Sequence, residues 1–139
     1  MSLCANLSFN GDCREAFEFY AQCFDGTIEF MGTYAGSPME SQFGPEMGPK
    51  IMHVALRLNA GKLDSGLLTG NDVPAKDYRK PQGFSLLYSL NDLSQAETIF
   101  RQLSESGTVQ MALEKTFWAE RFGVVTDRFG IPWAINCAS

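Results

Sequence analysis

The feature that most constrains the fold of this chain is an internal repeat. The segments DCREAFEFYAQCFDGTIEF (residues 12–30) and DLSQAETIFRQLSESGTVQM (residues 92–111) carry similar residues in the same order. One extra residue in the second segment brings Gly26 into line with Gly107. Two copies are too few for a solenoid, which stacks several repeats. The repeat therefore predicts two related halves packed as one unit, with a cavity between them as the natural place for function.

The hydrophobic pattern predicts strand, helix, strand, strand and strand in each half. Asp12 and Asn91 or Asp92 are the expected helix N-caps, and the helices end near Gly26 and Gly107. We expect strands over residues 3–9, 27–34, 51–58, 63–70, 84–90, 108–113, 122–127 and 131–137. Asn59 to Lys62 reads as a hairpin turn, and residues 35–49 as a long loop that could include one helical turn.

This order of elements predicts an α+β fold. Two βαβββ modules are expected to form one curved, mixed, eight-stranded sheet around a cavity, with the helices outside. We expect a single domain over residues 1–139. Module one covers about 1–70, a linker about 71–83, and module two about 84–139.

Composition and charge exclude several classes of function. The chain is 45% hydrophobic and 19% charged, which is typical of a soluble globular protein. With a formal net charge of −5 and no basic run, we expect no nucleic-acid partner. No apolar run reaches the roughly 18–20 residues of a membrane span, and no secretory signal pattern is present. We therefore expect a cytoplasmic protein whose four cysteines are reduced, buried or half-buried thiols.

Five segments spread over nearly the whole chain form a distinctive set: FNGDCREAFEFY (9–20), KIMHVALRL (50–58), TGNDVP (69–74), FSLLYSLND (84–92) and TFWAERFGVVTDRFGIPWAIN (116–136). The set resembles the PhnB-like branch of the glyoxalase/bleomycin resistance protein/dioxygenase superfamily, also called the vicinal-oxygen-chelate fold. The resemblance implies paired βαβββ modules and a homodimer. Members of the branch often carry a demethylubiquinone methyltransferase label. This chain has no glycine-rich strand-to-helix turn for a nucleotide-like cofactor, so we expect no such cofactor.

The resemblance also implies where a metal would bind. Metal-dependent members of the superfamily place a His or Glu ligand on the first and last strand of each module. Aligning the two modules puts Ala5, Ser85 and Ala134 at three of these positions, and Gly70, or Thr69 with a one-residue slip, at the fourth. A divalent ion needs at least three strong side-chain ligands, so we predict that no metal binds there. Small residues would instead leave room in the cavity.

The single histidine is the candidate acid or base. His53 lies on the third predicted strand, in register with Ala55 and Arg57. It could titrate near neutral pH or donate a hydrogen bond to a ligand, or it could simply be held by the backbone of the sheet. Asp72 and Glu120 are the carboxylates that could orient it.

Other residues are expected to line the pocket. Phe117 and Trp118 correspond to the cavity rim of the family and could form one wall for an organic ligand, or they could pack in the core or a dimer interface. Strand alternation predicts that Phe9 and Leu87 face inward, and Ser85 could add a hydrogen bond. Arg121 and Arg128 favour surface salt bridges over binding of a carboxylate. The long loop contains Met39 and Met47, and Met52 follows it. A methionine-bearing lid over the cavity is therefore a further possibility.

The sequence leaves several functions open. The first hypothesis is a protein that binds a small organic molecule without a metal. The alternatives are a metal-assisted lyase, isomerase or dioxygenase, a His53-dependent enzyme without a metal, and a structural or regulatory dimer with a vestigial cavity. We favour the first, because small side chains at the ligand positions are combined with aromatic residues.

Overall fold

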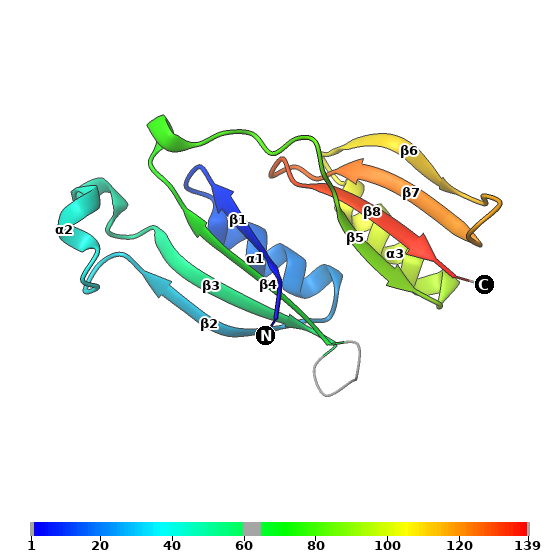
Figure 1. Ribbon diagram of the computed structural model, residues 1–139, viewed down its shortest axis with the longest axis horizontal. Helices are drawn as coiled ribbons and strands as arrows, with labels where there is room; N and C mark the ends of the chain where they lie inside the picture. The colour runs from blue at the N-terminus through cyan, green and yellow to red at the C-terminus, as the bar shows by residue number, and fades with distance from the viewer. Residues whose placement is uncertain (1, 60–64, 139) are drawn as a thin grey trace. The chain divides into compact units, whose positions relative to one another are not determined.

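The protein divides into two compact units, residues 1–78 (unit 1) and residues 79–139 (unit 2). The computed structural model describes residues 2–59 and 65–138. The boundary falls inside the predicted linker, although Asn71 and Asp72 belong to the preceding strand. Each unit is a mixed four-stranded sheet with a helix against one face (Figure 1). The predicted α+β class and the two βαβββ modules are confirmed, with the eight strands hydrogen-bonded as two four-stranded sheets rather than one.

Unit 1 contains a sheet with strand order β1-β4-β3-β2, in which β1 and β4 are parallel and the other pairs are antiparallel. Short helical turns occur in the loop before β3 and after β4. The elements are β1 (Ala5–Phe9), α1 (Cys13–Cys23), β2 (Thr27–Thr33), α2 (Glu40–Phe43), η1 (Pro45–Met47), β3 (Ile51–Leu58), β4 (Gly66–Asp72) and η2 (Ala75–Asp77).

Unit 2 repeats this topology with strand order β5-β8-β7-β6 and a parallel β5–β8 pair. It lacks counterparts of α2, η1 and η2 among the described residues. The elements are β5 (Leu86–Leu90), α3 (Leu93–Ser104), β6 (Thr108–Glu114), β7 (Arg121–Thr126) and β8 (Pro132–Cys137). No helix in the described part of the chain is long and apolar enough to cross a membrane.

The core of unit 1 lies between α1 and the sheet. Phe17 and Tyr20 of α1 are fully buried, and the Phe17 ring meets the Phe9 ring edge-on at 6.0 Å between centroids. Burying each such aromatic side chain stabilises the fold by about 1.5–3 kcal/mol. A Cβ atom added at Gly70 of β4 would lie 2.6 Å from the Phe17 ring. Glycine is therefore needed at Gly70 so that α1 can approach the sheet.

The N-terminus of α1 is capped by a residue far away in the sequence. Asp12 occupies the predicted N-cap position, but its side chain makes no capping hydrogen bond. Instead the buried Asp72 carboxylate at the end of β4 accepts hydrogen bonds from the backbone N–H groups of Cys13 (3.0 Å) and Ile51 (2.9 Å). Asp72 thus joins α1, β3 and β4 at one point.

Unit 2 is held together by similar packing and by a different aspartate. Ala96, Ile99, Phe100 and Leu103 form the buried stripe of α3, and Leu93 at its first turn is half-buried. Asp92, one of the two expected caps, caps the helix by accepting from the Gln95 N–H at 3.1 Å. At the turn between β7 and β8, the buried Asp127 carboxylate accepts from the backbone N–H of Phe129 and Ile131 and from Trp133 Nε1. Gly130 has a φ of 89° in this turn, a conformation that favours glycine.

The long loop before β3 is ordered by contacts to the rest of unit 1. Residues 40–43 and 45–47 form short helical turns, so the loop contains more regular structure than the single turn considered from the sequence. The Tyr34 hydroxyl donates to the Asp72 backbone oxygen at 2.8 Å, and the Tyr34 ring lies 5.0 Å from the Phe43 ring. The hairpin predicted at Asn59 to Lys62 lies, after Asn59, outside the described residues.

Three of the four cysteines are buried, and none of them forms a disulfide in the described part of the chain. Cys4 is exposed, which differs from the prediction of buried or half-buried thiols. Burial raises the pKa of the Cys13 thiol, and the Asp72 carboxylate raises it further. Because a thiolate is the reactive form, Cys13 is an inert structural residue.

Because the pKa of the buried Cys13 thiol is raised, we expect the folded state to lose stability at alkaline pH. Above the ordinary thiol pKa of 9.0 the unfolded chain releases this proton whereas the folded chain keeps it, so the folded state is disfavoured as the pH rises. We expect a decline of up to about 1.4 kcal/mol per pH unit from this group. Urea unfolding of the parent, Cys13→Ala and the exposed control Cys4→Ala between pH 8 and 10 would measure it. An equal decline in Cys13→Ala and the parent would contradict the assignment.

Candidate functional site

Each sheet has one face covered by its helix and a second, helix-free face, and most of the candidate residues lie on the helix-free faces. In unit 1, polar side chains dominate that face. The Thr69 hydroxyl donates to Asn6 Oδ1 at 2.7 Å, and Asn6 Nδ2 donates to Asn71 Oδ1 at 3.0 Å. By strand alternation and register, the helix-free face of unit 1 includes Asn6, Ser8, Thr27, Phe30, His53, Ala55, Arg57, Leu67, Thr69 and Asn71.

His53 lies on this face and is exposed. Its ring centroid is 5.8 Å from that of Phe30, and Gly32 is its partner on β2. Asp72, one of the two carboxylates considered as a partner for His53, instead lies on the helix-covered face with both carboxylate oxygens bonded to backbone N–H groups. Glu120 belongs to unit 2, where it forms an ion pair with Arg121 at 3.2 Å. A catalytic role for His53 stays a prediction.

Two of the four predicted metal-ligand positions lie on the wrong face. Ala5 alternates with the buried Leu7 and Phe9, and a Cβ at Gly70 would meet Phe17 of α1, so both positions face the helix. The reason is one extra residue in the turn between β1 and α1, compared with the turn between β5 and α3. A one-residue slip moves every side chain of a strand to the opposite face.

The same slip affects the pocket residues. Phe9, predicted to face the cavity, is buried against Phe17 in the core of unit 1. Counting back from the strand ends, Cys4 corresponds to Ser85, and Thr69 corresponds to Ala134. The alternative alignment at Thr69 is therefore the correct one.

The corrected positions do not fit a divalent metal. They provide one thiol, from Cys4, and the hydroxyls of Thr69 and Ser85, whereas alanine at position 134 provides no ligand. Three strong ligands are needed, and a neutral hydroxyl is a weak one. Within residues 2–59 and 65–138, no three His, Cys, Asp or Glu side chains lie close enough together to hold a metal ion. A metal-free site stays a prediction.

The helix-free face of unit 2 is apolar along its centre, in contrast to that of unit 1. Four residues that are partners across neighbouring strands form a row over its centre. They are Leu87 on β5, Ala134 on β8, Val124 on β7 and Met111 on β6. Leu87 is 63% exposed on this face, and its predicted place in the wall of a cavity stays a prediction. The next row crosses Ser89, Asn136 and Phe122.

An aromatic cluster borders this face. The Trp118 ring lies 5.3 Å from the Phe122 ring and 4.9 Å from the Phe117 ring. Phe117 is 97% exposed and Trp118 is 54% exposed, so neither is a core residue of unit 2. Their role as the wall of a ligand pocket stays a prediction.

A groove of about 600 Å³ opens at the other end of the same face. It is lined by residues of β6, β7 and β8 and by the segment that leads into β5, and it includes the predicted Ser85. Lys80 is the one charged side chain among the described residues that line it. The lining consists of Lys80, Pro81, Gln82, Gly83, Phe84, Ser85, Gln110, Val124, Thr126 and Pro132.

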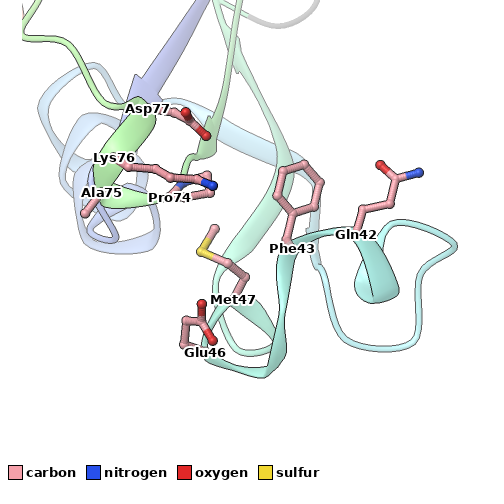
Figure 2. A pocket seen from close by; sticks show the side chains of 8 residues that line it. All are labelled: Gln42, Phe43, Glu46, Met47, Pro74, Ala75, Lys76 and Asp77. Atoms are coloured by element: carbon pink, nitrogen blue, oxygen red, sulfur yellow. The ribbon is translucent and has the colours of Figure 1, made fainter.

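A second pocket, of about 480 Å³, lies within unit 1 between the long loop and η2. Figure 2 shows side chains of the loop, among them Phe43 and Met47, on one side and Pro74 to Asp77 on the other. Met47 is buried, whereas Met39 is exposed, so the methionines named in the sequence do not act as one group. The sequence does not predict this pocket, because its two walls are about 30 residues apart in the chain.

Of the two arginines considered in the sequence, Arg121 forms the expected surface ion pair. Arg121 bonds to Glu120, as a surface salt bridge should, and Arg128 lies over the Phe129 ring at 4.7 Å from its centroid. Arg57 forms an ion pair with Glu29 at 3.3 Å.

Comparison with known proteins agrees with the architecture. The family described as 3-demethylubiquinone-9 3-methyltransferase matches residues 1–136. Protein YjdN from Escherichia coli (strain K12) is 30% identical, over 98% of this chain and 95% of its own length. Protein PA1353 from Pseudomonas aeruginosa is 38% identical, with a TM-score of 0.85 over 99% of this chain and 98% of its own.

The fold extends to more distant proteins. A glyoxalase/bleomycin resistance protein/dioxygenase family enzyme from Burkholderia phytofirmans PsJN has a TM-score of 0.63 at 15% identity, over 98% of this chain and 97% of its own. The chain therefore belongs to the PhnB-like family described as 3-demethylubiquinone-9 3-methyltransferase, and it has the fold of the glyoxalase/bleomycin resistance protein/dioxygenase superfamily.

Proposed function

We propose that this protein binds a small organic molecule on the helix-free face of unit 2, without a metal ion. The observation that carries the proposal is the combination of exposed apolar side chains on this face with the groove beside Ser85. Ligand sites are typically concave, mostly apolar, about 300–1,000 Å³ in volume, and supplied with a few well-placed polar groups. The groove falls in this range, and Ser85, Gln110 and Thr126 supply polar groups.

The charge of the groove suggests the class of ligand. Lys80 is basic and no carboxylate occurs among the described lining residues, so the groove favours a neutral molecule or an organic acid. Methyl transfer is not part of the proposal. The sheets of both units are mixed and four-stranded, unlike the doubly wound parallel sheet that typically binds nucleotide-like cofactors.

Leu87→Glu tests this function. The substitution places a carboxylate in the middle of the apolar face, so we expect at least a tenfold loss of affinity for any organic molecule bound there. Stability should change by less than about 0.5 kcal/mol, because Leu87 is largely exposed. The measurement is a thermal-shift screen of metabolites with and without EDTA, followed by calorimetric titration of the compounds that stabilise the protein.

Ser94→Glu is the matched control, because Ser94 is exposed on α3 and the substitution adds the same charge away from the face. We expect its affinities to equal those of the parent. Ligands that bind Leu87→Glu as tightly as the parent, or binding that EDTA abolishes, would contradict the proposal.

A His53-dependent enzyme is the second candidate, and it is favoured by the exposed position of His53 beside Phe30 on the helix-free face of unit 1. A general base must reach the proton that it removes, and this position allows a substrate to approach. If turnover of a bound compound is found, His53→Ala should reduce it by 10²-fold or more. Unchanged turnover in His53→Ala would exclude this candidate.

A further inference from the structure

The two units carry the same pair of polar residues at matching positions. Ser8 of β1 lies opposite Asn71 of β4, and Ser89 of β5 lies opposite Asn136 of β8. Each serine is one residue before the end of its strand, and each asparagine is likewise one residue before the end. Strand alternation places both pairs on the helix-free faces. The repeat therefore preserves a Ser–Asn pair that lies outside the positions considered for a metal.

In unit 1 both the oxygen and the nitrogen of the asparagine amide make hydrogen bonds. Asn71 Oδ1 accepts from Asn6 Nδ2 at 3.0 Å, and Asn71 Nδ2 donates to the Asp72 backbone oxygen at 3.3 Å. Asn6 lies on β1 two residues before Ser8. The carbonyl of the asparagine thus obtains its donor from the neighbouring strand.

In unit 2 the corresponding donor is missing. The position of Asn6 is occupied by Leu87, two residues before Ser89, and leucine has no group to donate. Asn136 Oδ1 is shielded from solvent and has no hydrogen-bond partner within residues 2–59 and 65–138. A buried acceptor without a donor is destabilising, and more than nine in ten buried polar groups in proteins have a partner.

The surroundings of Asn136 indicate what could supply the donor. Phe122 is its partner on β7, and the Trp118 ring packs edge-on against Phe122. Leu87 lies on the adjacent strand and is largely exposed. A flat apolar molecule could pack against these side chains while an N–H or O–H group on its edge reaches the amide oxygen.

We propose that Asn136 is the polar anchor of the binding face and selects a flat, apolar ligand that carries an N–H or O–H donor. The inference rests on the proposed function of unit 2 and adds the chemical class of the ligand. Because Asn136 Oδ1 is shielded, the ligand must displace neighbouring side chains to reach it. A molecule without a donor would leave the acceptor unpaired and would bind more weakly.

The experiment compares two fragments of nearly the same shape. Indole has an N–H donor, and benzofuran has an oxygen at that position. Titration of each into ¹⁵N-labelled protein, followed by the amide signals and the Trp118 indole N–H signal, gives both the affinity and the location of binding. We expect the parent to bind indole at least about tenfold more tightly than benzofuran, which corresponds to 1.4 kcal/mol.

Two variants remove the free acceptor in different ways. Asn136→Leu deletes the amide, and Leu87→Asn restores the donor that unit 1 has at Asn6. We expect the preference for indole to disappear in both. The Tm of Asn136→Leu should equal or exceed that of the parent, because an unpaired buried acceptor has been removed. A Tm lowered by more than about 5 °C would show that the Asn136 amide is paired in the native protein, and it would overturn the proposal.

The outcomes separate the inference from the function on which it rests. If both fragments bind equally well at Leu87, Val124 and Trp118, the proposed role of Asn136 is wrong, even if a water molecule pairs with its oxygen. The proposed function would still stand. A preference for indole that persists in Asn136→Leu would have the same effect. If neither fragment shifts the signals of the helix-free face up to its solubility, both the inference and the proposed function of this face fail.

Discussion

Replacing Asp72 by alanine is expected to destabilise the protein by about 3–5 kcal/mol, a large part of the 5–15 kcal/mol that holds a typical domain folded. The Asp72 carboxylate is 1% exposed and accepts the backbone N–H groups of Cys13 and Ile51. Each buried N–H left without a partner costs about 1–3 kcal/mol, and a charged acceptor makes the lost bonds stronger than average. Urea unfolding monitored by circular dichroism would give the free energy directly.

Asp77→Ala is the matched control for this prediction. Asp77 is also in unit 1, five residues further along the chain, but it is exposed. Its replacement should change the stability by less than about 0.5 kcal/mol. A loss below 1 kcal/mol in Asp72→Ala would mean that water or another group satisfies both N–H donors, which would contradict the role assigned to the carboxylate.

Asp127→Ala is expected to have an effect of similar size, about 3–4 kcal/mol, in unit 2. The carboxylate accepts from the Ile131 N–H at 3.0 Å and from Trp133 Nε1 at 2.9 Å, and it also accepts from the Phe129 N–H. These bonds hold the turn that sets the register of β7 against β8. Without them, we expect the turn to open and Trp133 to become more accessible to a fluorescence quencher.

A double-mutant cycle with Trp133→Phe isolates one of these bonds. Phenylalanine preserves most of the buried ring and removes the indole N–H, so it removes the donor to Asp127 Oδ2 without opening the turn. We expect a coupling free energy of about 1.5–3 kcal/mol between Asp127 and Trp133, as for a hydrogen bond to a charged group. Additive effects of the two substitutions would show that this bond does not contribute to stability.

The parts of the fold that depend on periodicity could be predicted from the sequence. The stripe at Ala96, Ile99, Phe100 and Leu103 identifies α3 and its buried face, because apolar residues at helical spacing have few alternatives. The repeat of the two segments likewise predicts the two βαβββ modules, because each copy carries the same order of apolar patterns. Local signals such as the Asp92 cap were also sufficient, since the bond to the Gln95 N–H spans only three residues.

The errors concern which face of a strand a residue occupies. An alignment of the modules on Asp12 and Asp92 does not allow for the longer turn that follows β1, so it places Ala5 and Phe9 on the wrong side of the sheet. Alanine and glycine at the compared positions fit either face, so the residues themselves gave no warning. The hydrophobic pair Leu7 and Phe9 was the signal that could have corrected the alignment, because apolar side chains in alternation mark the helix-covered face.

Contacts between distant residues could not be predicted at all. Asp72 lies 59 residues from Cys13, and its role depends on β1 and β4 ending side by side. The unpaired oxygen of Asn136 likewise becomes visible only when Leu87 is found where unit 1 has Asn6. Such features follow from strand register, which a single sequence specifies only through the complete fold.

The strands of one unit form no hydrogen-bonded ladder with those of the other among the described residues, which bears on how the protein could be divided and on how it arose. Every ladder among the described residues pairs strands of the same unit, so a chain break between Tyr78 and Arg79 would cut no hydrogen-bonded sheet. Each half would contain all the strands and the helix of one βαβββ module. This division also fits an origin in which one gene segment was copied and fused in tandem, after which each copy could change its binding face independently.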